Sequence, residues 1–220
     1  ILIQNPSTTQ AIFGFDEITG RFWAVLNPEN NSWIRLPPGV ESAAWSPDGT
    51  RIVYYKDGDI SIRNIINQKE NKITSIMGLD INLLWQKTDF IDLIGKPTSQ
   101  APNSWLRLNL NSKNIEIKRD NIAGLMINWY GKEKLGLELR SDNFSGNLNI
   151  INEDGDVLQS LSFLTMPQKC GFGKNIMVCA IPRETKPRMQ WPDDYLKNGF
   201  LGRDDVYRFD LISGEVTAIW

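Results

Sequence analysis

Two pairs of residues in this sequence have types and spacing that could support chemistry: Asp193 with Asp194, and Cys170 with Cys179. Adjacent carboxylates suggest a metal site, but neighbouring side chains of an extended chain point in different directions. The alternating oxygen ligands and turn glycine of a calcium loop are also absent here. We therefore expect the two aspartates to cap a short helical turn at 195–198 rather than to bind a metal.

The sequence offers little support for catalysis. It contains no histidine, which excludes a Ser-His-Asp or Cys-His arrangement and a His-ligated zinc within this segment. Its Gly171-Phe172-Gly173 run falls in an expected hairpin, not between a strand and a helix, so it does not predict a phosphate loop. A carboxylate pair for glycoside hydrolysis stays open, although no feature selects one. We predict no enzyme activity, no cofactor and no metal for this segment.

Composition is that of a globular domain. The chain has 220 residues, of which 41% are hydrophobic, so it can bury a substantial core. Its 24 basic and 26 acidic residues give a net charge of −2, which argues against nucleic acid as a partner. No run of 18 apolar residues is present, so no membrane-spanning segment is predicted in this piece.

An aromatic-centred hairpin repeats along the chain. Its anchors are Trp45, Trp85, Trp129 and Phe172, at steps of 40, 44 and 43 residues. A period of roughly 40–45 residues with four strands per unit is typical of a β-propeller. Aromatic residues at one fixed position per unit are expected to pack between neighbouring sheets. We predict an all-β fold, a β-propeller of four-stranded antiparallel blades.

About five blades are visible, and they form one propeller domain over 1–220. The predicted blade ranges are 1–40, 41–80, 81–122, 123–165 and 166–220. The chain begins at Ile1 rather than Met and ends on a strand-like segment, so we expect it to be part of a longer protein and of a larger ring. Blade number in the intact protein stays open between five and eight.

We call the four strands of a blade A, B, C and D in chain order. The cysteines occupy matched positions if Lys174 and Asn175 form the tip of the hairpin between strands A and B of the last blade. Cys170 then lies opposite Cys179, since each facing pair of residue numbers sums to 349. Opposed residues of an antiparallel pair bring their Cβ atoms within disulfide range. A disulfide implies an oxidising compartment. The alternative is two buried thiols that act as small apolar residues.

Several segments resemble known propellers. The run Trp45-Ser46-Pro47-Asp48-Gly49-Thr50-Arg51-Ile52-Val53-Tyr54 resembles the repeat of TolB-like bacterial propellers. Further segments resemble a group of uncharacterised members of that family: Lys96-Pro97-Thr98, Ala101-Pro102, Gln168-Lys169-Cys170, Val178-Cys179-Ala180-Ile181-Pro182-Arg183 and Trp191-Pro192-Asp193-Asp194-Tyr195. This resemblance implies a membrane anchor outside the present piece, an extracytoplasmic propeller and the disulfide. The second and third hairpins lack the Ser-Pro-Asp-Gly tip of that repeat.

Two connections between the second and third strands of a blade are long, at 95–104 and 182–204. Because strands alternate in direction, both connections are expected on the same face of the ring, where binding loops are usual. The candidate binding residues in them are Lys96, Gln100, Arg183, Arg188, Trp191, Asp193, Asp194 and Tyr195. The longer connection could instead be a packed segment that only covers the ring opening.

We predict a non-catalytic binding or scaffold propeller whose partner is a protein or a cell-envelope glycan. The sequence does not choose between these partners, and it does not fix the oligomeric state. The alternative is the propeller of a larger hydrolase, either a domain that gates a peptidase or part of a glycan-active enzyme. A hydrolase domain elsewhere in the full reading frame would favour that alternative.

Overall fold

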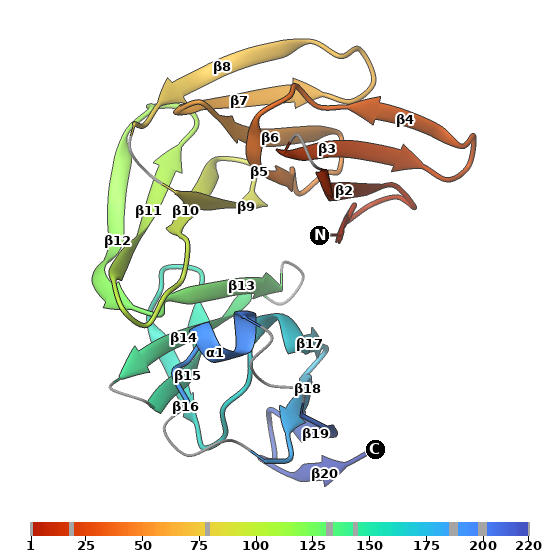
Figure 1. The fold of residues 1–220 in the computed structure, drawn as a ribbon. Coiled ribbons are helices and arrows are strands. Elements are labelled where there is room, and N and C mark those ends of the chain that lie inside the picture. The colour runs from red at the N-terminus through yellow and green to blue at the C-terminus, as the bar shows by residue number, and fades with distance from the viewer. Residues whose placement is uncertain are drawn as a thin grey trace. The chain divides into compact units, whose positions relative to one another are not determined.

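The chain is all-β, and its strands form five four-stranded antiparallel blades of a β-propeller (Figure 1). The computed structural model describes residues 2–17, 20–77, 80–130, 134–142, 145–184, 189–197 and 202–219. The predicted fold class is confirmed. The chain divides into two compact units, one of Ile1–Gly95 with Leu106–Ile117 and one of Lys96–Trp105 with Lys118–Trp220.

In every blade the strands follow one another in chain order, so each sheet is a simple meander. Blade 1 comprises β1 (Leu2–Gln4), β2 (Ala11–Glu17), β3 (Gly20–Asn27) and β4 (Ser32–Arg35). Blade 2 comprises β5 (Val40–Trp45), β6 (Arg51–Lys56), β7 (Asp59–Asn64) and β8 (Glu70–Ser75). Blade 3 comprises β9 (Ile81–Lys87), β10 (Phe90–Gly95), β11 (Pro102–Asn109) and β12 (Ile115–Ala123).

The last two blades carry the short helical elements. Blade 4 comprises β13 (Met126–Tyr130), β14 (Leu135–Asp142), β15 (Ser145–Asn152) and β16 (Val157–Leu161). Blade 5 comprises β17 (Cys170–Gly173), β18 (Ile176–Pro182), β19 (Asp204–Asp210) and β20 (Val216–Ala218). A 3-10 turn, η1 (Pro167–Lys169), precedes β17, and one turn of helix, α1 (Asp193–Leu196), lies between β18 and β19.

The first strand of blade 5 starts later than the sequence predicts. A strand is expected over 168–172, but η1 occupies its first two positions and β17 begins at Cys170. Pro167 has no N–H to donate to a strand ladder, and its fixed φ suits the start of a helical turn. The Lys169 N–H closes that turn by donating to the Met166 carbonyl over 2.9 Å. This part of the strand prediction was wrong.

The Ser-Pro-Asp-Gly turn of blade 2 is held by its own side chains. The Asp48 carboxylate accepts hydrogen bonds from Ser46 Oγ at 2.6 Å, from the Thr50 N–H at 3.0 Å and from Thr50 Oγ1 at 2.9 Å. Gly49 has φ +70°, and a Cβ atom there would lie 2.2 Å from Asn5 Oδ1. The buried Asn5 amide donates to the Gly49 carbonyl over 2.9 Å, so this turn also joins blades 1 and 2.

Strand C of each blade ends in an Asn or Asp that caps the following turn. The side-chain oxygen accepts hydrogen bonds from backbone N–H groups two to four residues ahead, at 2.8–3.0 Å. The five residues are Asn27, Asn64, Asn109, Asn152 and Asp210. This Asx-turn chemistry competes with continuation of the strand and fixes where each C–D turn begins.

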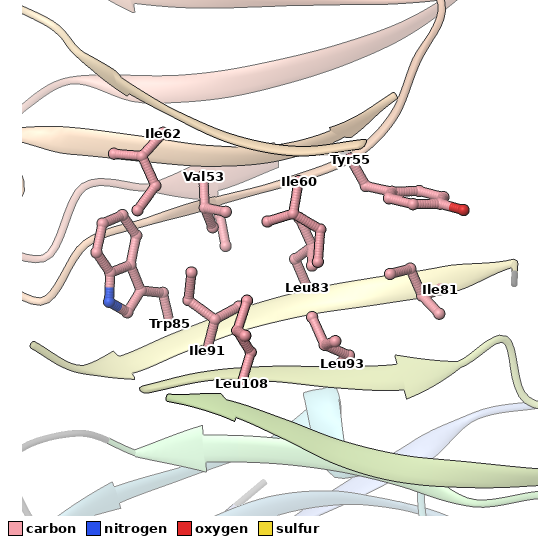
Figure 2. Packing of buried hydrophobic residues seen from close by; sticks show 11 residues of the cluster. Val53, Tyr55, Ile60, Ile62, Ile81, Leu83, Trp85, Ile91, Leu93 and Leu108 are labelled. Atoms are coloured by element: carbon pink, nitrogen blue, oxygen red, sulfur yellow. The ribbon is translucent and has the colours of Figure 1, made fainter. Parts of the chain in front are cut away.

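Within each compact unit, apolar faces of neighbouring blades pack against one another. Between blades 2 and 3, Val53 and Tyr55 of β6 lie opposite Ile91 and Leu93 of β10, all at 2% exposure or less (Figure 2). Residues two apart share one face of a strand. Val53 and Tyr55 therefore lie on one face of β6, and Ile91 and Leu93 lie on one face of β10. Complete burial of the three aliphatic side chains among them stabilises the fold by about 1.5–3 kcal/mol each.

The repeated tryptophans pack between sheets, as predicted. Trp45 is buried in the core of blades 1 and 2, and Trp85 in the core of blades 2 and 3. Trp129 makes an edge contact with Trp105, with 5.7 Å between ring centroids. The Trp45 indole N–H also donates to the Ile3 carbonyl over 3.1 Å. These side chains therefore belong to the core of the fold.

Candidate functional site

The two long connections meet at one buried carboxylate. The first, residues 96–101, joins β10 to β11, and the second, residues 183–203, joins β18 to β19. The Ser99 N–H and Thr98 Oγ1 both donate to Asp193 Oδ2, the latter over 3.3 Å. The two connections are therefore in contact at this carboxylate. We call the described residues 96–101, 183–184, 189–197 and 202–203 together the connection face.

The environment of Asp193 favours its ionised form. Desolvation alone would raise the pKa of this carboxyl. The hydrogen bonds from Ser99 and Thr98 and the charge of Lys197 together lower the pKa by more than desolvation raises it, so it lies below its ordinary value. Lys197 Nζ lies 3.7 Å from Asp193 Oδ1. A carboxylate that accepts several hydrogen bonds stays charged near neutral pH. Its role here is to join two connections that are 94 residues apart in sequence.

Apolar residues fix the longer connection to the core. Met189 and Trp191, at 4% and 2% exposure, pack into the core of blades 4 and 5. The Trp191–Pro192 peptide bond is cis. Pro192 lies against Gly124, where a Cβ atom would be 3.1 Å from Pro192 Cδ and 2.6 Å from Ser141 Cβ. Gly124 also has φ +62°, so both its backbone conformation and its surroundings require glycine.

The start of β19 and helix α1 are held by one lysine. Lys169, on η1, pairs with Asp204 at the first position of β19. The same ammonium lies 5.1 Å from the centroid of the Tyr195 ring, within cation–π range. Tyr195 in turn stacks on Trp191, with 5.8 Å between ring centroids and 15° between the ring planes. Lys169 therefore links helix α1 to the start of β19.

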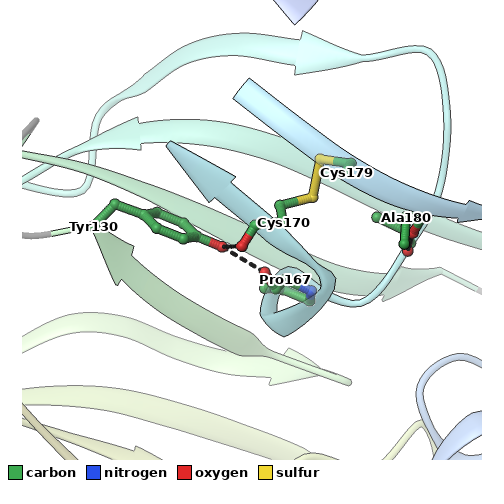
Figure 3. The surroundings of a disulfide bond; sticks show 6 residues. Tyr130, Pro167, Cys170, Cys179 and Ala180 are labelled. Carbon is green, nitrogen blue, oxygen red and sulfur yellow. Dashed lines mark hydrogen bonds between the residues drawn. A yellow bond between two sulfur atoms is a disulfide. The ribbon is translucent and has the colours of Figure 1, made fainter. Parts of the chain in front are cut away.

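A disulfide and a tyrosine lie beside η1 (Figure 3). Cys170 pairs with Cys179 in the register expected from the sequence, and a disulfide joins them. The Tyr130 hydroxyl lies 2.6 Å from the Pro167 carbonyl oxygen and 2.8 Å from that of Cys170. Desolvation raises the pKa of Tyr130 to about 12. Sequence reasoning missed Tyr130, because only its position beside Trp129 distinguishes it.

The candidate residues lie in two different environments. Trp191 and Asp193 are buried, and Asp194 and Tyr195 are half-buried. These side chains stabilise the connection, and Asp194 Oδ2 accepts a hydrogen bond from the Gln190 N–H over 2.9 Å.

The other candidates point outward where the structure describes them. Lys96, Gln100 and Arg183 are exposed. Arg183 is engaged at the base of the connection, where its guanidinium donates to both carboxylate oxygens of Asp205. This pairing lowers the pKa of Asp205. Arg188 lies outside the described residues.

The expected capping of a helical turn at 195–198 was wrong. Helix α1 spans Asp193–Leu196, its N-cap is Pro192, and no side chain caps it. The two aspartates lie within its first turn, and their carboxylates accept from Ser99 and Gln190 instead. Long-range partners of this kind cannot be read from the local sequence.

Two features are absent from the part of the chain that the structure describes, namely a cluster of metal-binding side chains and a helix that could span a membrane. In the ranges that the structure describes, no three His, Cys, Asp or Glu side chains gather closely enough to hold a metal ion. Among the same residues, neither length nor hydropathy allows any helix to cross a membrane.

Solved structures share the fold of this chain, whereas no family model and no curated protein matches it. A puromycin-hydrolysing peptidase from Mycobacterium tuberculosis has a TM-score of 0.65 at 12% identity, over 100% of this chain and 36% of its own. TolB from Acinetobacter baumannii has a TM-score of 0.60 at 13% identity, over 99% and 51%. The β-propeller domain of the Trilobed protease from Pyrococcus furiosus has a TM-score of 0.58 at 12% identity, over 97% and 68%.

The class of protein that these findings define is a β-propeller of the kind seen in TolB and in peptidase propeller domains. Identities of 12–13% establish the fold alone. The chain spans about half of TolB and about a third of the puromycin-hydrolysing peptidase. Propellers host many unrelated functions, so function must be argued from the site.

Proposed function

We propose that this chain is a non-catalytic binding propeller that holds a partner on its connection face. The observation that carries this proposal is the bond network at Asp193, which joins residues 96–101 to residues 183–203. Binding residues that are tied to a rigid scaffold lose little entropy when they bind. Buried Met189 and Trp191 fix their own part of the longer connection to the core, while Gln100 and Leu196 stay exposed.

We place the protein outside the cytoplasm, anchored by a segment that these 220 residues do not include. The disulfide between Cys170 and Cys179 supports this location, because such bonds do not persist in reducing cytosol. The partner is then a protein or a glycan of the cell envelope. Non-reducing intact-mass measurement on protein from its native cell, after thiol alkylation, tests the location. Two alkylated cysteines would contradict it.

Capture from an envelope fraction tests the binding role. We expect the wild-type chain to retain a specific macromolecule and a Gln100→Asp/Leu196→Asp double variant to lose at least 90% of it, a tenfold effect that corresponds to ~1.4 kcal/mol. The matched control is Ile212→Asp, because Ile212 is 77% exposed but lies on the C–D turn of blade 5. Equal capture by all three proteins would show that the connection face does not bind the captured macromolecule.

A second candidate is the propeller domain of a larger hydrolase. Its support is the shared fold with the puromycin-hydrolysing peptidase, of which this chain spans 36%. The full reading frame separates the two candidates. A flanking hydrolase domain, with peptidase activity in the intact protein, would favour this candidate over the binding propeller.

A further inference from the structure

The face of blade 1 that points away from blade 2 is rich in aromatic side chains. Ile12 of β2 and Val25 of β3 lie in the core that blades 1 and 2 share. Because side chains alternate along a strand, the neighbouring residues of β2 and β3 lie on the opposite face of the sheet. The aromatic residues of that opposite face are Phe13, Phe15, Phe22 and, on β4, Trp33. We call these four residues the aromatic face of blade 1.

The four rings form one continuous patch. The ring centroid of Phe13 lies 5.8 Å from that of Phe15 and 5.7 Å from that of Trp33. The Phe22 ring lies 5.0 Å from the Phe15 ring. Trp33 is 49% exposed, the three phenylalanines are partly exposed, and Leu2, which pairs with Phe13, is 64% exposed. Contiguous apolar surface of this kind marks a place where another surface binds.

The two blades that follow show what covers the equivalent face. In β6, Ile52 and Tyr54 lie in the core that is shared with blade 1. Val53 and Tyr55 lie in the core that is shared with blade 3. Blade 2 therefore receives blade 1 on one face and presents its other face to blade 3. Because blade 1 presents its Ile12 face to blade 2, its aromatic face corresponds to the receiving face of blades 2 and 3.

The presenting faces have a chemistry of their own, since most of their side chains are isoleucine or valine. They include Ile12, Val25 and Ile34 in blade 1 and Val53, Ile60 and Ile62 in blade 2. Each receiving face places an aromatic ring against them, Trp45 in blade 2 and Trp85 in blade 3 (Figure 2). The aromatic face of blade 1 thus has the composition of a receiving face.

We propose that the aromatic face of blade 1 binds the isoleucine- and valine-rich face of another β-blade, which the same polypeptide forms outside residues 1–220. In both interfaces described above, the presenting and receiving blades belong to one chain and are consecutive in it. Side chains of two sheets packed face to face interdigitate, so branched aliphatic groups fill the spaces between the rings. The inference goes beyond the proposed function, because it concerns a different surface from the connection face.

Photo-cross-linking in the protein encoded by the full gene tests this proposal. The photoreactive amino acid p-benzoylphenylalanine replaces Trp33, which keeps an aromatic side chain at that position. The matched control replaces Ile66, which is 83% exposed on the turn between β7 and β8. We expect position 33 to cross-link within its own polypeptide to an isoleucine or valine of a strand outside residues 1–220. Position 66 should not reach that strand, and peptide mapping by mass spectrometry identifies the products.

Hydroxyl-radical footprinting of the unsubstituted full protein gives an independent readout. If another blade covers the aromatic face, Trp33 should be oxidised within about threefold of the rate of Trp45, which is 4% exposed. Faster oxidation of Trp33 would show that the face is open to solvent and would overturn the proposal. Because no residue is replaced, this measurement does not depend on the folding of a variant.

The cross-linked products distinguish the other occupants. Cross-links from position 33 to a second copy of the chain or to a separate protein would overturn the proposal and assign the face to association between molecules. Cross-links confined to residues 1–220 would overturn it as well, and so would a full gene that encodes no further β-blade. None of these outcomes bears on envelope capture through Gln100 and Leu196, so the proposed function stands or fails separately.

Discussion

At the residue scale, single polar side chains determine how the connections are held. Asp193 joins two connections, Lys169 joins η1 to β19 and α1, and Tyr130 spans two carbonyls beside the disulfide. Each makes contacts far from its own position in sequence. Their contribution is large where burial would leave a partner unsatisfied after substitution.

Asp193→Asn should destabilise the second unit in a pH-dependent way. Because the folded-state pKa of Asp193 is lowered, its contribution is present above the unfolded pKa of about 3.9 and is lost as pH falls through the folded value. We expect the free energy of unfolding to fall by about 1–2 kcal/mol at pH 7, and this difference should shrink below pH 4. Urea unfolding at several pH values measures it. Asp57→Asn, at a side chain with 79% exposure, is the control, and an equal effect there would contradict the prediction.

Tyr130→Phe should lower the free energy of unfolding by about 1–3 kcal/mol, because the single hydroxyl proton that the Pro167 and Cys170 carbonyl oxygens share is lost while the ring packing remains. Tyr55→Phe is the comparison, since the Tyr55 hydroxyl donates to the Ile76 carbonyl at 3.1 Å in a part-buried position. Equilibrium denaturation of both variants gives the two values. A smaller loss of unfolding free energy in Tyr130→Phe than in Tyr55→Phe would argue against a stabilising hydrogen bond from Tyr130 to the carbonyls at η1.

At the element scale, the C–D turns repeat a backbone conformation with different residues. In blades 1, 2, 3 and 5, the residue four positions after the capping Asn or Asp has positive φ. These residues are Asn31, Gln68, Lys113 and Gly214, at φ 51–75°. Only glycine adopts this region without steric cost. The turns are therefore strained at Gln68 and Lys113 and relaxed at Gly214.

Lys113→Gly should raise stability by about 0.5–1 kcal/mol, and Gly214→Ala should lower it by about 1–2 kcal/mol. No heavy atom lies within 4 Å of a Cβ built at Gly214, so its loss would come from φ alone. Thermal unfolding of both variants, each against wild type, checks the two signs. A stabilised Gly214→Ala would refute the common turn conformation.

Much of the fold was predictable because it depends on short sequence patterns that repeat along the chain. The aromatic anchors, the Pro47-Asp48-Gly49 turn and the Cys170–Cys179 register needed only spacing and alternation. The capping residues of the C–D turns were missed, because their steps along the chain are uneven. Asp193 was misinterpreted as a local cap, since its partners lie 94 and 95 residues away.

At the scale of the whole molecule, two compact units carry separate cores, and the disulfide lies in only one of them. Cross-linking across nine residues restricts the unfolded chain of that unit and stabilises it by roughly 2–3 kcal/mol. Reduction should therefore affect the units unequally.

Hydrogen exchange in moderate denaturant, with and without reductant, tests this expectation. Amides of β17–β19 should lose protection at lower denaturant after reduction, whereas those of β6 and β10 should not change. Alkylation with mass analysis confirms that the disulfide has opened. Equal loss of protection in both sets would show that the two units unfold together.

In-cell photo-cross-linking tests the central claim most directly, namely that the connection face binds a partner. A photoreactive amino acid replaces Gln100, Leu196 or, as the control on the A–B turn of blade 5, Lys174. The account predicts that positions 100 and 196 cross-link to the same macromolecule and that position 174 does not. Cross-links from position 174 alone, or different products from 100 and 196, would contradict a binding surface built from both connections.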